Sequence, residues 1–153
     1  MEGVKFKDSP ISKSIAELLV QRDQKTLAMW AADCAEHVLH CFETKRSHDV
    51  RPREAIEAGR AWAHGEISMS KARSAAFAAH AAARDAADHT AASATARAAG
   101  HAAATAHVAG HAVHAATYAA KAAAYSTGPA NAAETIDRER NWQFQHLLSM
   151  RRR

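Results

Sequence analysis

The chain has 153 residues, of which 41 are alanine, and its formal net charge at pH 7 is +4. Leu, Ile, Val and Phe are scarce, but a disordered chain would be expected to carry a larger net charge. Because alanine is the strongest helix former, the composition excludes a β-rich fold and a disulfide scaffold and predicts an almost wholly helical protein.

The first part of the chain predicts three helices, because its apolar residues recur at helical spacing. Ser9 is expected to start a helix over residues 10–21. Asp23 is expected to cap a second helix that continues to residue 45, and the third helix is expected over residues 52–65.

The rest of the chain predicts the remaining helices. Ser68 and Thr90 are expected to cap the fourth and fifth, and a break near residues 108–110 separates the fifth from the sixth. Ser126 to Pro129 forms a stop-and-restart signal, after which a last helix is expected over residues 129–150.

Alanine is concentrated in one part of the chain, with 29 of the 41 between residues 72 and 124. A leucine-type core cannot form there, but helices with alanine faces can approach one another closely. We therefore expect an all-α fold: a single compact bundle of about six to seven helices with a closely packed Ala-rich layer. The domain is expected to span residues 1–153, with flexible tails at 1–8 and 150–153.

Several partners and locations are disfavoured by the sequence. Residues 98–120 carry no charge, but they are mostly alanine and include four histidines, so we expect a buried helical region and no membrane contact. No basic stripe indicates nucleic-acid binding, and no motif indicates a cofactor. Cys34 and Cys41 lie too far apart on one helix for a disulfide, and no signal region is visible, which favours the cytoplasm. Exposed alanine faces would favour a homodimer.

Histidines form the sharpest pattern. His107, His111 and His114 would share one face if they lay on one helix. Since histidines at i and i+4 can bind zinc, His107 and His111 are candidate metal ligands. The favoured interpretation is nevertheless structural, with no metal: imidazoles supplying hydrogen bonds between alanine-rich helices. A face that binds a partner or senses pH is the third alternative.

Other polar residues are candidates for the same interior role. Asp33, His37 and His80 fall among apolar residues of predicted helices. Charged residues between 51 and 60 could form ordinary pairs on a helix surface or a polar cluster between helices.

Three blocks of sequence resemble a known bacterial family. The distinctive ones are W-A-A-D-C-A-E at residues 30–36 and R-P-R-E-A-I-E-A at residues 51–58. The third block joins residues 75–84 to 98–108 and 111–121, and Trp142–Gln143 also fits. Over residues 29–146 the chain thus resembles the immunity-protein-5-like group of bacterial immunity proteins.

The resemblance implies an all-α protein that binds a co-encoded toxin and neutralises it without catalysis. Such an interface needs anchor residues, for which Trp and Arg are typical. The candidate anchors are Arg51, Arg53, Trp62 and Trp142. One alternative is a metal-binding helical protein or metal-dependent enzyme that uses His107 and His111. Another is a nucleic-acid or structural protein that uses the terminal Arg151–Arg153 triplet.

Overall fold

A computed structural model describes residues 3–150, which form eight α-helices and no strand. The helices are α1 (Ile11–Leu19), α2 (Gln24–His37), α3 (His40–Glu43), α4 (Arg51–Ala63), α5 (Met69–Asp85), α6 (Thr90–Ala104), α7 (His111–Thr127) and α8 (Ala132–Ser149). The all-α prediction is confirmed, whereas the predicted number of six to seven helices is slightly too low. The Arg151–Arg153 triplet, and with it most of the tail expected at 150–153, lies outside the described residues.

The extra helix arises where one continuous helix was expected from Asp23 to Lys45. α2 ends at His37, and the chain turns before α3 begins at His40. The turn carries Phe42 into a separate cluster of buried alanines from α5 and α6, away from the cluster that holds most of α2. The hydroxyl of Thr95 on α6 donates to the backbone oxygen of Val38 at this turn.

Two of the predicted caps are present. The side chain of Asp23 accepts a hydrogen bond from the backbone of Thr26, and Ser68 accepts one from Lys71. Thr90 is the first residue of α6 and does not cap it. These caps satisfy backbone N–H groups that have no partner within the helix.

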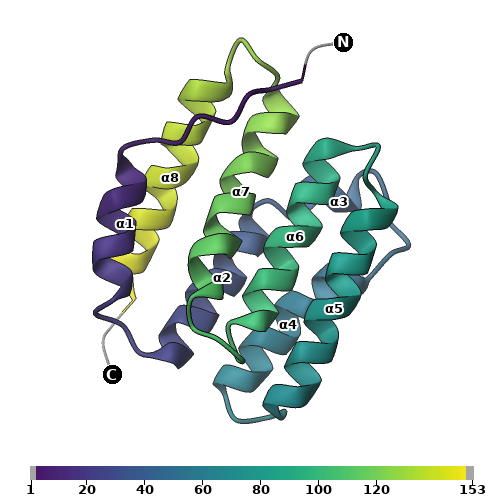
Figure 1. Cartoon of the computed structure of the whole chain (residues 1–153), viewed down its shortest axis with the longest axis vertical. Helices are drawn as coiled ribbons and strands as arrows, with labels where there is room; N and C mark the ends of the chain where they lie inside the picture. The colour runs from purple at the N-terminus through teal and green to yellow at the C-terminus, as the bar shows by residue number, and fades with distance from the viewer. Residues whose placement is uncertain (1–2, 151–153) are drawn as a thin grey trace.

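The helices form two layers, with α5, α6, α7 and α8 side by side at the front of Figure 1 and α2 and α4 behind them. α6 lies at the centre and packs against α5, α7, α4 and α2, whereas α1 packs mainly on α8. No described helix is both long and apolar enough to cross a membrane.

Alanine fills the middle of this arrangement. Every buried residue of α7 is alanine, and on α6 only Thr95 and Gly100 depart from this rule. Larger side chains from α2, α4 and α8, including Trp30, Ile56 and Leu147, complete the same core. Since burial of one methyl group contributes only about 0.8 kcal/mol, stability depends on many close contacts. A Cβ on Gly59 of α4 would lie 3.3 Å from the carbonyl oxygen of Ala102 on α6, which shows how closely these helices approach.

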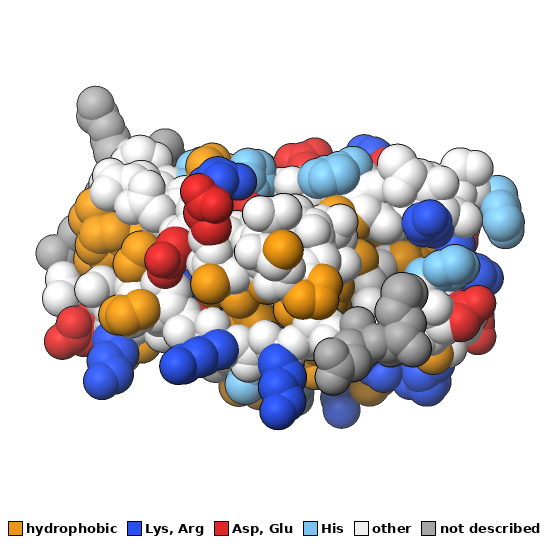
Figure 2. Space-filling view, turned by 90° about the horizontal axis from the view of Figure 1, so that it is seen from above, with side chains coloured by type: hydrophobic (Ala, Val, Ile, Leu, Met, Phe, Trp, Pro, Cys, Tyr) orange, Lys and Arg blue, Asp and Glu red, His pale blue; other side chains and the backbone are white. Residues whose placement is uncertain are grey.

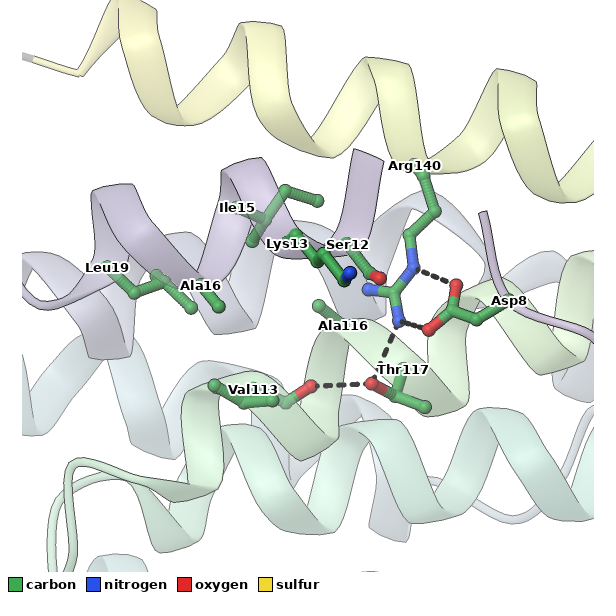
Figure 3. A pocket seen from close by; sticks show the side chains of 10 residues that line it. All are labelled: Asp8, Ser12, Lys13, Ile15, Ala16, Leu19, Val113, Ala116, Thr117 and Arg140. Carbon is green, nitrogen blue, oxygen red and sulfur yellow. Dashed lines mark hydrogen bonds and ion pairs between the residues drawn. The ribbon is translucent and has the colours of Figure 1, made fainter. Parts of the chain in front are cut away.

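A buried arginine fastens the N-terminal segment to the bundle (Figure 3). The side chain of Arg140 on α8 is only 3% exposed, and it donates to both carboxylate oxygens of Asp8, at 3.0 and 2.8 Å. It also donates to Thr117 on α7 and to the buried Gln143. Burial raises the pKa of Asp8, but the hydrogen bonds and charge of Arg140 outweigh this effect and hold that pKa below its usual value. Part of the expected tail, residues 3–8, is thus in contact with α7 and α8.

Candidate functional site

Polar and aromatic side chains gather in two separate places on the bundle. The first, which we call the carboxylate clamp, joins α2, α4 and α8. Its members are Asp33, Glu36, His37, Arg60, Glu139, Trp142 and His146. The second, which we call the histidine cluster, joins α5, α6 and α7. Its members are His80, Arg97, His101, His111, His114 and Tyr118.

Each histidine of the carboxylate clamp donates to a carboxylate on another helix. His37 at the end of α2 donates through Nδ1 to Glu139 of α8 at 2.7 Å. In the opposite sense, His146 of α8 donates through Nε2 to Asp33 of α2 at 2.8 Å. These two reciprocal bonds tie α2 to α8, whose own backbone contacts are few.

Arg60 brings α4 into the same clamp. Its guanidinium lies 2.7 Å from Asp33 and 2.6 Å from Glu36. Asp33 therefore accepts from Arg60 and from His146 at once, and it is the residue on which the three helices converge. Each cation or imidazole of the carboxylate clamp thus faces an acid.

The clamp also contains a three-ring stack. The centroid of the Trp142 ring lies 3.7 Å from that of His37 and 4.9 Å from that of His146. The plane of each imidazole is within 8° of the plane of the indole. Glu139, Trp142 and His146 occupy positions i, i+3 and i+7 of α8, a spacing that places them on one helix face. Both faces of the Trp142 ring are therefore covered by imidazoles.

The histidine cluster has the opposite electrostatic character, because cations and imidazoles surround one another without a carboxylate. His101 of α6 is central: its Nδ1 lies 2.9 Å from Nδ1 of His111, and its ring lies within 5.4 Å of the rings of His80, His114 and Tyr118. Only one of two facing Nδ1 atoms can carry the shared proton, so the pair is held together while at least one ring is neutral.

Burial and neighbouring positive charges lower the pKa values of His80, His101 and His111. Burial, reinforced by Arg97 and His111, lowers the pKa of His80 to about 4. Burial, reinforced by His80 and His111, lowers the pKa of His101 to about 3. Burial, reinforced by His114 and His107, also lowers the pKa of His111. Arg97 donates to Nδ1 of His80 at 2.9 Å, which leaves the proton of neutral His80 on Nε2.

Gly100 provides the space that the His80 ring occupies. A Cβ at Gly100 would lie only 2.7 Å from Nε2 of His80. Helix α6 continues through Gly100 without interruption, so the role of this glycine is to admit the imidazole of α5.

The residues singled out in the sequence lie in two separate sites, a grouping that their spacing along the chain did not predict. Asp33 and His37 lie in the carboxylate clamp, whereas His80, His111 and His114 lie in the histidine cluster. His107 does not share a helix with His111, because α7 begins at His111 and His107 is exposed in the preceding turn. The expected i, i+4 pair is therefore wrong, and His101 takes the place that His107 was given.

The four candidate anchors lie in different surroundings. Arg51 donates to Asp49 and to Asp85 at 2.7–2.9 Å, and Arg53 donates to both oxygens of Glu43. Trp62 near the end of α4 is half-buried. Trp142 lies in the carboxylate clamp, so the four residues do not form one cluster.

Five residues of these two sites and of the Asp8–Arg140 pair were not found from the sequence. They are Arg97, His101, Glu139, Arg140 and His146. A signal existed for two of them, since Arg97 and His101 are four residues apart and therefore share a helix face. The other three depend on which helix lies opposite α8, which spacing alone does not contain.

Two further findings bear on function. Between residues 3 and 150, no group of three or more His, Cys, Asp or Glu side chains is arranged to hold a metal ion. Cys34 is fully buried, and this burial raises the pKa of its thiol well above the usual value.

Comparison with known proteins gives a family. No curated protein and no solved structure shows a significant match to the chain. The profile of the family described as "Imm-5 like putative immunity protein" matches residues 17–150, which cover most of the 153 residues and all helices except the first six residues of α1. The chain therefore belongs to this immunity-protein family.

Proposed function

We propose that the protein binds a toxin protein and neutralises it by contact, without catalysis. The observation that carries this proposal is the family match over residues 17–150. We further propose that the chain acts as one helical domain in the cytoplasm of a bacterium that also encodes the toxin.

The chemistry of the polar sites agrees with a binding role. In the carboxylate clamp, the groups that could act as acids or bases are hydrogen-bonded to one another: His37 to Glu139 and His146 to Asp33. The thiol of Cys34 is buried, and its raised pKa disfavours the thiolate that a nucleophile requires.

Arg51, Arg53, Trp62 and Trp142 remain candidate anchors for the toxin. Arg51 and Arg53 would have to exchange their present carboxylate partners for those of the toxin, and Trp142 offers only its ring edge beyond the two covering imidazoles. Among residues 3–150, the Trp62 side chain takes part in no ring contact and no hydrogen bond of this kind.

A co-expression assay tests the proposed function. The gene adjacent to this one in its genome would be expressed in a bacterial host with and without this protein, and survival would be counted. We expect the neighbour to be toxic alone and harmless with this protein, and the purified pair to form a complex. A toxic neighbour that still kills in the presence of correctly folded protein would contradict the proposal, as would a neighbour without toxicity.

Alanine substitutions of the four candidate anchors form the second part of this assay. Alanine substitution of a true anchor residue should weaken the affinity of the complex at least 30-fold, which corresponds to about 2 kcal/mol of binding free energy. Ala substitution of exposed Lys25 serves as the control and should leave the complex within about twofold.

A further inference from the structure

Helices α5, α6 and α7 lie side by side at the front of Figure 1. Their large side chains fall on one face of this layer, as the spacing along each helix indicates. On α5, Arg73, Phe77, His80 and Arg84 follow one another at spacings of four, three and four residues. On α7, His111, His114, Tyr118 and Lys121 follow at spacings of three, four and three. These spacings keep each set on one side of its helix, and Arg97 and His101 of α6 lie between them.

This arrangement is informative because the surrounding sequence is so poor in large residues. The inward sides of these helices are almost entirely alanine. The large side chains of this part of the chain are therefore mostly outside, and their convergence on one face is not a by-product of core packing.

Carboxylates are scarce on this face. No Asp or Glu occurs between Asp88 and Glu134, so α6 and α7 carry none, and Asp85 at the end of α5 is paired with Arg51. Lys121 on α7 lies close enough to Asp8 of the N-terminal segment to contribute to the lowered pKa of Asp8. The cations contact aromatic rings: Arg73 lies 5.4 Å from the centroid of Phe77, and Lys121 lies 4.9 Å from that of Tyr118. Figure 2 looks down on the end of the bundle where α7 turns into α8 and shows Lys and Arg side chains along its lower edge, with Asp and Glu only toward the two ends of that edge.

Apolar side chains accompany the charges. Phe77 on α5 is 61% exposed, and Tyr118 on α7 is half-buried. Exposed aromatic residues together with arginine are the typical composition of interface hot spots. The part of the face from Arg73 to Arg84 is about 17 Å long, and three helices are about 20 Å wide, so it can form the centre of an interface of roughly 800 Å² per partner.

We propose that this α5–α7 face is the surface that binds the toxin, and that the toxin presents Asp and Glu side chains to it. The inference rests on the proposed function and adds to it the location of the interface and the chemistry of the partner. It places the interface on this face instead of at the four candidate anchors, which lie on α4 and α8. Carboxylates of the partner would pair with the exposed guanidinium groups of Arg73 and Arg84 and with the ammonium group of Lys121.

A protein partner is favoured over a nucleic acid by the nature of the face. Four of its ten residues are imidazoles that are half-buried or surrounded by cations, and its four permanent cations are spread over three helices. A nucleic-acid site would instead use a row of exposed Lys and Arg along which the phosphates run.

Charge reversal at matched positions tests the proposal. In the triple variant Arg73→Glu, Arg84→Glu and Lys121→Glu, the toxin domain with its activity abolished should bind at least tenfold more weakly. The control variant Lys25→Glu, Lys45→Glu and Arg138→Glu changes the net charge equally on other surfaces, and should bind within about threefold of the unaltered protein. Circular dichroism establishes that both variants fold.

The outcomes separate the two proposals. If the unaltered protein does not bind the toxin domain, the proposed function fails and this inference fails with it. If the toxin binds and both triple variants bind equally well, or equally poorly, the toxin does not use the α5–α7 face, while the proposed function stands.

A second measurement uses a probe of known chemistry. The imidazole Cε1–H signals of the unaltered protein would be followed by NMR during addition of a 15-residue poly-glutamate peptide, and separately of a 15-nucleotide oligothymidylate. We expect the peptide to shift His101, His111 and His114, and not His37 or His146, whose partners are acids. Absence of these shifts, or tighter binding of the oligonucleotide at the same residues, would overturn the assignment of an acidic protein partner.

Discussion

The carboxylate clamp and the histidine cluster use the same side chain in opposite surroundings. In the clamp each imidazole donates to a carboxylate on another helix, so the residues satisfy one another and hold α2, α4 and α8 together. In the histidine cluster the imidazoles contact one another, Arg97 and Tyr118, and burial lowers the pKa values of His80 and His101. A satisfied cluster contributes to the fold, whereas a cluster without acids retains a preference for an acidic partner.

The largest expected effect on stability comes from removing the Asp8 carboxylate. The buried guanidinium of Arg140 then has no acid beside it. Asp8→Ala should lower the free energy of unfolding by about 3 kcal/mol, near the lower end for a broken buried pair, since Asp8 itself is one-third exposed. Urea unfolding measures it. Glu17→Ala, at an exposed position of α1, is the control, and equal small losses in both variants would show that Arg140 does not need Asp8.

Removal of the carboxylate shared by α4 and α8 should have the next largest effect. Asp33→Ala deprives both Arg60 and His146 of an acceptor and should cost about 2 kcal/mol in urea unfolding. Asp137→Ala, at an exposed position of α8, should change stability by less than 0.5 kcal/mol. A similar value for both would mean that the clamp is not a stabilising unit.

Lowering the pH should destabilise the protein through the histidine cluster, at pH values above those at which carboxylates titrate. The folded-state pKa values of His80 and His101 are lowered to about 4 and about 3, so below pH 6.5 the unfolded chain takes up protons that the folded protein does not. Stability is therefore fully present above pH 6.5 and declines as the pH falls toward 4. Between pH 7.5 and 5.5 the loss should be about 1.5 kcal/mol, half the ideal value for two histidines because both rings are partly exposed.

Thermal unfolding at several pH values measures this loss. His101→Asn should flatten the pH dependence between pH 7.5 and 5.5, whereas His40→Asn, at an exposed position, should leave it unchanged. If stability depends on pH as steeply in His101→Asn as in the unaltered protein, the pH dependence does not arise from the histidine cluster.

The smallest expected effect on stability is at Gly100. Gly100→Ala forces the His80 ring outward, because the new Cβ would lie 2.7 Å from Nε2. The higher helix propensity of alanine, worth about 1 kcal/mol, offsets much of the lost contact, so the net change should be below 1 kcal/mol. The sharper readout is NMR titration: the pKa of His80 should move from about 4 toward 6.5 as the ring becomes solvated. A pKa that stays near 4 would show that Gly100 does not position the ring.

Several elements could be predicted from the sequence because their causes are local. The caps at Asp23 and Ser68 follow from side chains that complete backbone hydrogen bonds, and the break before α7 falls at Gly110, a residue type that interrupts helices. The break between α2 and α3 could not be predicted, because it brings Phe42 under α5 and α6, which are distant in sequence. The pairing of His107 with His111 failed for a local reason, because the predicted break near residues 108–110 separates the two histidines.

The sequence alone determined that this protein is helical, that its second half has an alanine interior, and that it resembles an immunity-protein family. Those properties depend on composition, periodicity and short blocks of adjacent residues. Only the tertiary structure decided which histidines face acids and which do not. Helix packing brings His37 to Glu139 and His101 to His80 over 102 and 21 residues of chain, and the electrostatic character of an imidazole is set by the residues that lie next to it in space.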